Sequence, residues 1–218
     1  MPGPYCTIIA GPNGSGKSSV YEKLRPVGEF VNADVIAATL PQHLSDRERR
    51  MRAGRIVVTL LRELTAKKRD FVFETTLSSK HSLDVMRNAR EAGFEVGLVF
   101  VTLDDPKENV KRVRLRVKLG GHDIPRADIL RRYEASFGRL AEAIQFAHET
   151  VVIDNTKKIP VWVFKVIGDT LILPPGQAYR RNEKRNEFHS RLIQIARTVA
   201  DTFIDKMTKL KPKPKIDI

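Results

Sequence analysis

Gly11-Pro12-Asn13-Gly14-Ser15-Gly16-Lys17-Ser18 is the stretch that decides the fold of this chain. It matches the pattern G-x-x-x-x-G-K-[ST] of a phosphate-binding loop. The apolar run Tyr5–Ala10 precedes it, and the following segment, Lys17–Leu24, has the pattern of a helix. A strand before the loop and a helix after it are the context that a phosphate-binding loop requires, so the sequence predicts one here.

The chemistry of such a loop follows from its backbone. Glycines let the chain curl so that several N–H groups point at one anion, and the next helix adds the positive end of its dipole. Lys17 then reaches the β- and γ-phosphates, and the Ser18 hydroxyl is a ligand for Mg²⁺. A glycine-rich turn that binds nothing is the alternative. We expect ATP or GTP to contact Gly11, Pro12, Asn13, Gly14, Ser15, Gly16, Lys17, Ser18 and Ser19.

Length and composition fit one globular unit with an appendage. The chain has 218 residues, of which 41% are hydrophobic and 30% charged, as in soluble globular proteins. No stretch reaches the apolar length that crosses a bilayer, and the start does not have the pattern of a secretory signal. Cys6 is the single cysteine, which excludes an internal disulfide and suits a reducing compartment. We expect a cytoplasmic protein with no membrane partner.

The formal net charge of +13 predicts a polyanionic partner: a nucleotide, a nucleic acid or an acidic protein. The surplus is concentrated between residues 107 and 132 and again between residues 180 and 215. Nucleic-acid modules interleave basic with aromatic residues, and these two stretches are poor in aromatics. Nucleic acid is therefore not the favoured partner.

Strands and helices alternate along the first 154 residues. This rhythm predicts an α/β fold with a mainly parallel sheet and helices on both faces. The expected strands are Tyr5–Ala10, Glu29–Asn32, Phe71–Thr75, Glu95–Leu103 and Val151–Asp154. The expected helices after the first are 45–68, with a capping box of Ser45 and Glu48, then 83–92, 106–118 and 127–147.

The pattern changes after Asp154. Val161–Ile167 and Leu171–Leu173 read as strands, and Pro174-Pro175-Gly176 breaks the chain. Beyond it we expect a long basic helix over 177–210 and a disordered tail. The chain is thus divided into a kinase-like domain, residues 1–173, and a basic helical extension, residues 174–218. One apolar stripe of the helix comprises Leu192, Ala196, Val199, Phe203 and Met207.

Polar side chains follow the expected strands, where ligands bind in parallel sheets. Asp34 comes directly after the second strand, beside Asn32. A kinase needs a group that accepts the proton of the acceptor hydroxyl, and Asp34 is our candidate for this base. The alternative is that Asp34 caps a helix over 35–40.

The third strand leads into Glu74, Thr75 and Thr76. An acidic side chain and two hydroxyls at this edge suit hydrogen bonding to a substrate with several hydroxyls. Glu74 is also a candidate to hold Mg²⁺ through water, and a turn with a capped helix is the alternative for the whole segment.

A basic helix over 106–118 is followed by Gly120-Gly121-His122 and by a second basic helix. Phosphoryl transfer spreads negative charge over the γ-oxygens, which arginines stabilise, and a glycine hinge suits a closing lid. We therefore expect an arginine-rich lid with His122 near phosphate. A solvated basic helix face is the alternative. The candidate phosphate ligands in the lid are Arg112, Arg116 and Arg132.

Taken in order, these motifs resemble the short, chromosomal-type members of the zeta toxin family of P-loop kinases. The resemblance spans about residues 4–156 and implies a P-loop kinase-like three-layer sandwich. The motifs are the phosphate loop, Asn32-Ala33-Asp34, Phe73-Glu74-Thr75-Thr76, Gly120-Gly121-His122-Asp123-Ile124-Pro125, Arg131-Arg132-Tyr133 and Ile153-Asp154-Asn155.

The resemblance implies a kinase that phosphorylates UDP-N-acetylglucosamine on the sugar and is restrained by an antitoxin. It implies that Lys17 and Ser18 hold the nucleotide phosphates and Mg²⁺, and that Asp34 is the base. The lid arginines, Arg116 and Arg132 among them, would stabilise the transferred phosphoryl group. Asn32, Glu74, Thr75 and Thr76 would face the acceptor, and Asp154 and Asn155 the nucleotide base.

Two alternatives remain at the level of sequence. One keeps the kinase but transfers the phosphoryl group to a nucleic-acid hydroxyl or to another metabolite. The other is a nucleotide-switched binding protein that engages its partner through the C-terminal helix.

Overall fold

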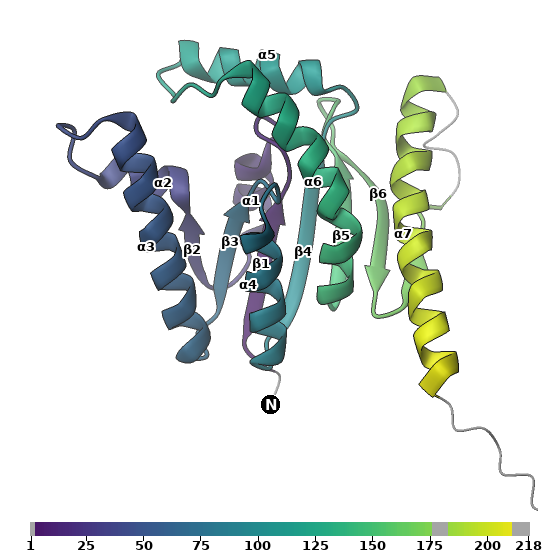
Figure 1. Cartoon of the computed structure of the whole chain (residues 1–218). Coiled ribbons are helices and arrows are strands. Elements are labelled where there is room, and N and C mark those ends of the chain that lie inside the picture. Colours follow the sequence, from purple (N-terminus) through teal and green to yellow (C-terminus); the bar gives the residue numbers. More distant parts are fainter. Residues whose placement is uncertain (1–2, 176–182, 211–218) are drawn as a thin grey trace, which may run out of the picture.

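A mixed sheet forms the centre of the molecule in the computed structural model, which describes residues 3–175 and 183–210 (Figure 1). Within these residues the strand order is β2-β3-β1-β4-β5-β6-β7. The first five strands in this order are parallel, whereas β6 pairs antiparallel with β5, and β7 antiparallel with β6. The strands are β1 Tyr5–Ala10, β2 Glu29–Asn32, β3 Phe71–Thr75, β4 Glu95–Thr102, β5 Glu149–Asp154, β6 Val161–Ile167 and β7 Thr170–Ile172. The helices are α1 Lys17–Leu24, α2 Ala33–Thr39, α3 Asp46–Ala66, α4 Lys80–Glu91, α5 Pro106–Lys118, α6 Arg126–Phe146 and α7 Glu183–Leu210.

The central strand, β1, is apolar because it lies between two parallel neighbours. Ile8 pairs with Phe73 of β3 and with Leu98 of β4, and all three side chains are buried. Cys6 on the same face is fully buried, and burial raises the pKa of its thiol far above the usual range. The cysteine is therefore a small core residue in its protonated form, as the sequence predicted.

Helices α3, α4, α6 and α7 lie in front of the sheet in Figure 1, and α1 lies behind it. More helices cover the front face of the sheet than its back face. On the front face α4 buries Met86 and α6 buries Phe137, whose ring meets Phe100 of β4 edge-on at 5.6 Å. Behind the sheet a cavity of about 400 Å³ remains, with Thr7 and Val99 in its wall. The predicted α/β sandwich with a mainly parallel sheet is confirmed.

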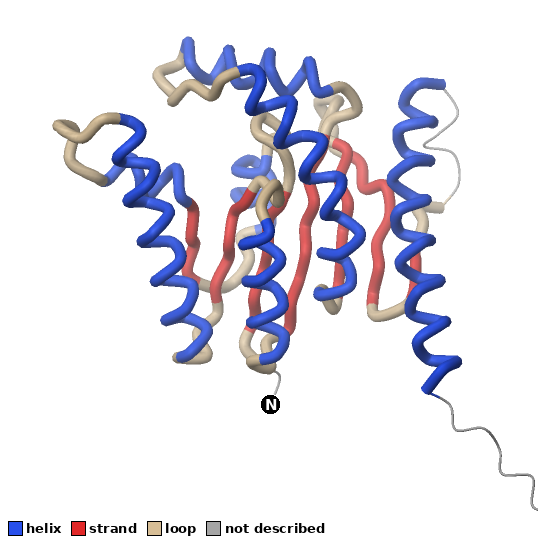
Figure 2. Tube along the Cα trace, in the orientation of Figure 1, coloured by secondary structure: helices blue, strands red, loops and turns tan. Residues whose placement is uncertain are grey.

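All five parallel strands present their carboxyl ends at one edge of the sheet, the upper edge to which their arrows point in Figure 1, and Figure 2 shows the loops at this edge in tan. The loops after β1 to β5 therefore gather there, although they are far apart in the sequence. Helix α5 lies across this edge, above the ends of the strands (Figure 1).

Two helix starts differ from the sequence prediction. Asn32 caps α2, since its Oδ1 accepts from the backbone N–H groups of Asp34, at 2.7 Å, and Val35, at 3.2 Å. The alternative in which Asp34 is the cap is therefore wrong, because Asn32 already satisfies these donors. Helix α4 begins at Lys80, ahead of the predicted Leu83, whereas α3 begins with the predicted capping box of Ser45 and Glu48.

The long C-terminal helix, α7, packs beside β6 in Figure 1. Leu192, Ala196 and Val199 are buried in the same core as the sheet. Within the described residues no helix, α7 included, combines the length and the apolar character needed to cross a membrane. The side chains of Phe203 and Met207 and the tail after Leu210, on which the sequence made predictions, lie outside the described residues.

Candidate active site

The phosphate loop leaves the end of β1 and leads into α1. Gly14 and Gly16 have φ angles of 77° and 93°, in the left-handed region that favours glycine. A Cβ on Gly16 would lie 2.2 Å from the side-chain nitrogen of Asn155, and one on Gly14 would lie 2.6 Å from the carbonyl of Asn109. The two glycines therefore allow both the turn and the close approach of its neighbours.

Two asparagines from distant parts of the chain hold the loop in place. Asn109 of α5 is fully buried, and its Nδ2 donates to the carbonyl of Asn13 at 2.7 Å. Asn155, directly after β5, donates from Nδ2 to the carbonyl of Ser15 at 2.8 Å. Because these bonds use loop carbonyls, they leave the loop amides and the first-turn amides of α1 to a ligand, except the Ser15 N–H, which donates to the Pro12 carbonyl at 3.2 Å.

Lys17 is the cation of this loop, and it is 7% exposed. Its Nζ donates to the carbonyls of Gly11, at 3.0 Å, and Pro12, at 3.3 Å, and lies 3.9 Å from Glu74 Oε1. Burial lowers the pKa of the Lys17 ammonium, and the Glu74 carboxylate partly offsets this effect. A partly desolvated cation beside a ring of amides is suited to an anion with several charges.

The loop residues fit a nucleotide with its metal ion. Ser15 Oγ is buried and, within the described residues, has no hydrogen-bond partner, so it is free to donate to a phosphate. Ser18 Oγ donates to Glu74 Oε2 at 3.4 Å, which puts a hydroxyl and a carboxylate together where Mg²⁺ would be held. Ser19 lies in the first turn of α1 and is exposed.

Asp34 lies opposite the phosphate loop in the first turn of α2. Its side chain is 51% exposed. Lys17, Asp34 and Glu74 share a cavity of about 460 Å³, which we name the acceptor cavity because the sequence predicts that Asp34 and Glu74 face the acceptor. The other predicted residues on its wall are Asn13, Asn32, Thr75, Thr76 and Arg132, joined by Arg50 and Arg131.

The lid formed by α5 and α6 brings basic side chains to both ends of this site. Arg132 donates from NH1 to Asn13 Oδ1 at 3.2 Å, and Arg116 donates from NH2 to the His122 carbonyl at 3.2 Å. His122 Nε2 lies 3.6 Å from Asp34 Oδ2, so this histidine contacts the candidate base. Arg112 donates to the carbonyl of Asn155 at 2.9 Å, on the side of β5.

The side chains of Thr75, Thr76 and Asp154, three further predicted site residues, also have partners within the protein. Thr75 Oγ1 lies 2.7 Å from Ser82 Oγ, and Thr76 Oγ1 lies 2.7 Å from Ser78 Oγ. Asp154 is fully buried, and its carboxylate contacts His189 of α7 at 2.7 Å. Asn155, not Asp154, is therefore the residue after β5 that contacts the phosphate loop.

Sequence reasoning missed Asn109 and His189. Asn109 stands next to Val110 on the buried side of α5, where an apolar residue is the rule, and this was a visible signal. His189 precedes Leu192 by one helical turn and continues the apolar stripe of α7, which was the other signal.

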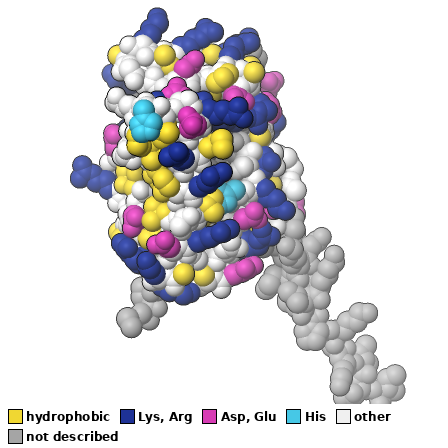
Figure 3. All heavy atoms as spheres, turned by 60° about the vertical axis from the view of Figure 1, so that its left-hand side comes forward, with side chains coloured by type: hydrophobic (Ala, Val, Ile, Leu, Met, Phe, Trp, Pro, Cys, Tyr) yellow, Lys and Arg dark blue, Asp and Glu magenta, His cyan; other side chains and the backbone are white. Residues whose placement is uncertain are grey.

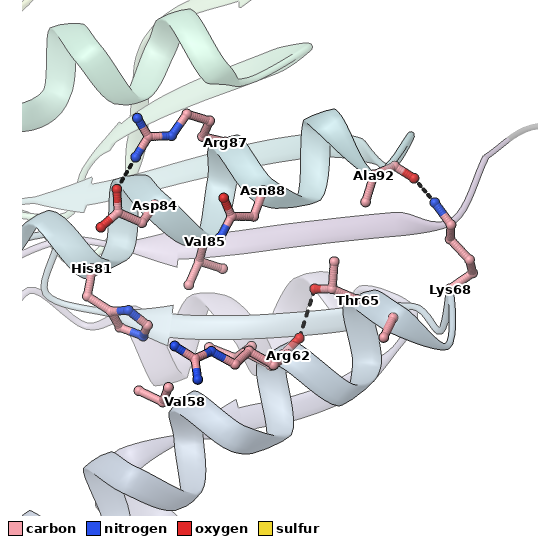
Figure 4. A pocket seen from close by; sticks show the side chains of 12 residues that line it. Val58, Arg62, Thr65, Lys68, His81, Asp84, Val85, Arg87, Asn88 and Ala92 are labelled. Carbon is pink, nitrogen blue, oxygen red and sulfur yellow. Dashed lines mark hydrogen bonds and ion pairs between the residues drawn. The ribbon is translucent and has the colours of Figure 1, made fainter.

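A larger groove of about 620 Å³ lies between α3 and α4, over the front of the sheet (Figure 4). It contains no phosphate-loop residue. His81 lines both this groove and the acceptor cavity, and burial lowers the pKa of its imidazole. In Figure 4 the ring of His81 points across the groove toward Arg62 and Val58 of α3. The groove therefore opens beside the site rather than forming it.

The chain is similar to known proteins in sequence and in fold. A model of the zeta toxin family matches residues 2–192. An uncharacterized protein of Haemophilus influenzae is 33% identical over 133 residues, which cover 59% of this chain and 89% of that protein.

Among solved structures, the AvrRxo1-ORF1:ORF2 complex with ATP matches with a TM-score of 0.66 at 15% identity, over 92% of this chain and 76% of that one. The PezAT toxin–antitoxin system of Streptococcus pneumoniae matches with a TM-score of 0.56 at 13% identity, over 89% and 88%. These two likenesses concern the fold. With the family match over nearly the whole length and the phosphate loop in its expected place, the chain belongs to the zeta toxin family of P-loop kinases.

Proposed function

We propose that this kinase transfers the γ-phosphoryl group of ATP or GTP to a hydroxyl of a sugar nucleotide such as UDP-N-acetylglucosamine. The observation that carries the proposal is a single cavity of about 460 Å³ with Lys17 of the phosphate loop, Asp34 and Arg132 in its wall. The γ-phosphate of the donor and the hydroxyl of the acceptor can react only if the residues that bind them line the same cavity.

Asp34 accepts the proton of the acceptor hydroxyl in this reaction. The hydroxyl oxygen then forms a bond to the γ-phosphorus, while the bond from that phosphorus to the β–γ bridging oxygen breaks and the nucleoside diphosphate leaves. Asn32 caps α2, so the Asp34 carboxylate is not used as a cap. His122, at 3.6 Å, orients that carboxylate from the lid.

Lys17 and the lid arginines stabilise the charge that spreads over the transferred group. Lys17 contacts the carbonyls of its own loop, and Arg132 contacts Asn13, so both side chains lie against the phosphate loop. Bound Mg²⁺ would neutralise phosphate charge and be held by Ser18, with Glu74 beside it.

The arginines on the outer wall of the acceptor cavity favour an acceptor that carries negative charge. Arg50 of α3 and Arg131 of α6 line the cavity, in addition to Arg132. The diphosphate of a sugar nucleotide supplies such charge. Figure 3 shows Lys and Arg side chains scattered among hydrophobic ones on the α3 side, without the continuous basic strip that a nucleic-acid backbone would favour.

We further propose that the chain is the toxin of a toxin–antitoxin pair and acts in the cytoplasm, where nucleotide donors and sugar nucleotides are found. The match to the PezAT toxin–antitoxin system supports a protein antitoxin as its partner.

The test is a panel of acceptors incubated with labelled ATP and Mg²⁺, with products identified by mass. We expect a sugar nucleotide to gain one phosphoryl group, and RNA with free 5′- or 3′-hydroxyls to gain none. Phosphorylated RNA as the main product would replace the proposed acceptor, and ATP hydrolysis with no phosphorylated acceptor would overturn the transfer reaction itself.

A further inference from the structure

We propose that His189 of α7 is a positioning residue for the nucleotide site, acting through Asp154 on the turn that holds the phosphate loop. His189 is 1% exposed and Asp154 is fully buried. His189 Nε2 lies 2.7 Å from Asp154 Oδ2, a hydrogen bond in which the ring nitrogen donates to the carboxylate. A buried carboxylate is costly unless donors surround it, so each side chain constrains the other.

Asp154 uses its second oxygen to shape the chain that follows β5. Oδ1 accepts from the backbone N–H of Thr156 at 2.9 Å and from its hydroxyl at 2.5 Å. A side chain that accepts from the residue two positions on closes an Asx turn. The orientation of the Asp154 carboxylate therefore determines where Asn155 lies.

The turn of residues 154–156 contacts three parts of the nucleotide site. Asn155 donates from its side chain to the Ser15 carbonyl, at 2.8 Å, and from its backbone N–H to the Thr102 carbonyl, at 2.8 Å. The carbonyls of Asn155 and Thr156 both accept from Arg112 of the lid helix, at 2.9 and 3.2 Å. The turn thus joins the phosphate loop, the end of β4 and α5.

The turn of residues 154–156 packs closely against the phosphate loop. Asn155 Nδ2 fills the space where Gly16 would carry a Cβ, at 2.2 Å from that position. Because protein interiors are close-packed, a displacement of Asn155 is passed on to the loop rather than absorbed. His189 therefore acts on the loop through two intermediate residues.

Apolar packing alone would hold α7 against the sheet. Leu192 and Val199 are buried in the core, and Phe188 meets Phe137 of α6 at 5.9 Å. A histidine in this stripe adds a directed hydrogen bond that an apolar residue would not provide. We infer that α7 completes the kinase site, instead of serving only as an appended partner-binding helix.

The proposal rests on nucleotide lying in the phosphate loop, and its test is direct binding of Mg²⁺ with a non-hydrolysable ATP analogue. His189→Phe keeps the bulk and removes the donor, and we expect the Kd to rise about tenfold, the loss expected for one positioning hydrogen bond. His189→Gln places an amide donor near the lost Nε2 and should restore the Kd to within about threefold. Should His189→Phe not fold, His189→Asn, whose amide cannot reach Asp154, replaces it.

Leu192→Ala is the matched control, because it removes a buried apolar side chain from the same helix and keeps the His189 bond to Asp154. It should lower the melting temperature and leave the Kd unchanged. Asn155→Ala should raise the Kd on its own, and combining it with His189→Phe should add little, since both act along one path.

An unchanged Kd in His189→Phe, or an equal rise in Leu192→Ala, would overturn the positioning role. Absence of nucleotide binding by the unmodified protein would instead remove the proposed function, so the two failures are distinguishable.

Discussion

At the residue scale, Asn32 and Asp34 have different roles, and this difference leaves the Asp34 carboxylate available for chemistry. Asn32 caps α2 with its side chain, so the side chain of Asp34, in the first turn, is not needed as a cap. It remains half-exposed beside the acceptor cavity. The favourable end of the helix dipole stabilises its negative charge there.

Replacing Asp34 with Asn tests its role as the base. The amide cannot accept the hydroxyl proton, so kcat should fall about 10²- to 10⁴-fold, the usual contribution of a general base. Nucleotide affinity should change little, because the phosphate loop is untouched. Steady-state kinetics with a calorimetric Kd measure both, and a variant with normal turnover would remove Asp34 from the mechanism.

At the scale of elements, the hinge between α5 and α6 positions the lid arginines. Gly121 packs against Arg116, since a Cβ there would lie 2.6 Å from Arg116 Cγ. Arg116 in turn donates to the His122 carbonyl at 3.2 Å, and His122 lies beside Asp34. Tyr133 fixes α6 from the other side by donating to the buried carbonyl of Leu103 at 2.8 Å.

Gly121→Ala should therefore displace Arg116 and lower kcat by up to about 10²-fold, as misplacement of a catalytic group does. Gly138→Ala in α6 is the control, because its Cβ would meet nothing within 4 Å. That variant should keep the normal rate and gain about 0.5–1 kcal/mol of stability. Equal rates for both variants would show that transfer does not depend on the position of Arg116.

At the scale of the whole molecule, the parallel sheet brings loops from five strands to one edge. The phosphate loop follows β1, Asp34 follows β2, Glu74 is the last residue but one of β3, and Asn155 follows β5. A nucleotide that binds at this edge should stabilise the entire fold by mass action.

A non-hydrolysable ATP analogue with Mg²⁺, at 100 times its Kd, should add about 2.7 kcal/mol to the free energy of unfolding. For a chain of this size the melting temperature should rise by about 5–10 °C. Lys17→Ala, which lacks the loop cation, should show a smaller rise at the same concentration. No rise in the unmodified protein would contradict nucleotide binding at the loop.

The α/β class, the strand sequence and the phosphate loop were predictable because they depend on local rules. Glycine tolerates the left-handed backbone at Gly14 and Gly16, and apolar runs mark buried strands. The partners of the loop were not predictable. Asn109 lies 96 positions from Asn13, and Asn155 lies 140 positions from Ser15.

The amino-acid sequence by itself determined that a phosphate loop connects a strand to a helix, and that carboxylates and hydroxyls follow the neighbouring strands. Only the tertiary structure decided that Asp154 is buried against His189, that Asn155 contacts the phosphate loop, and that His122 meets Asp34. The physical reason is the distance along the chain over which each kind of interaction acts. Backbone preference and hydrophobic periodicity act over a few residues, whereas these hydrogen bonds and ion pairs form only after the sheet and its helices have packed.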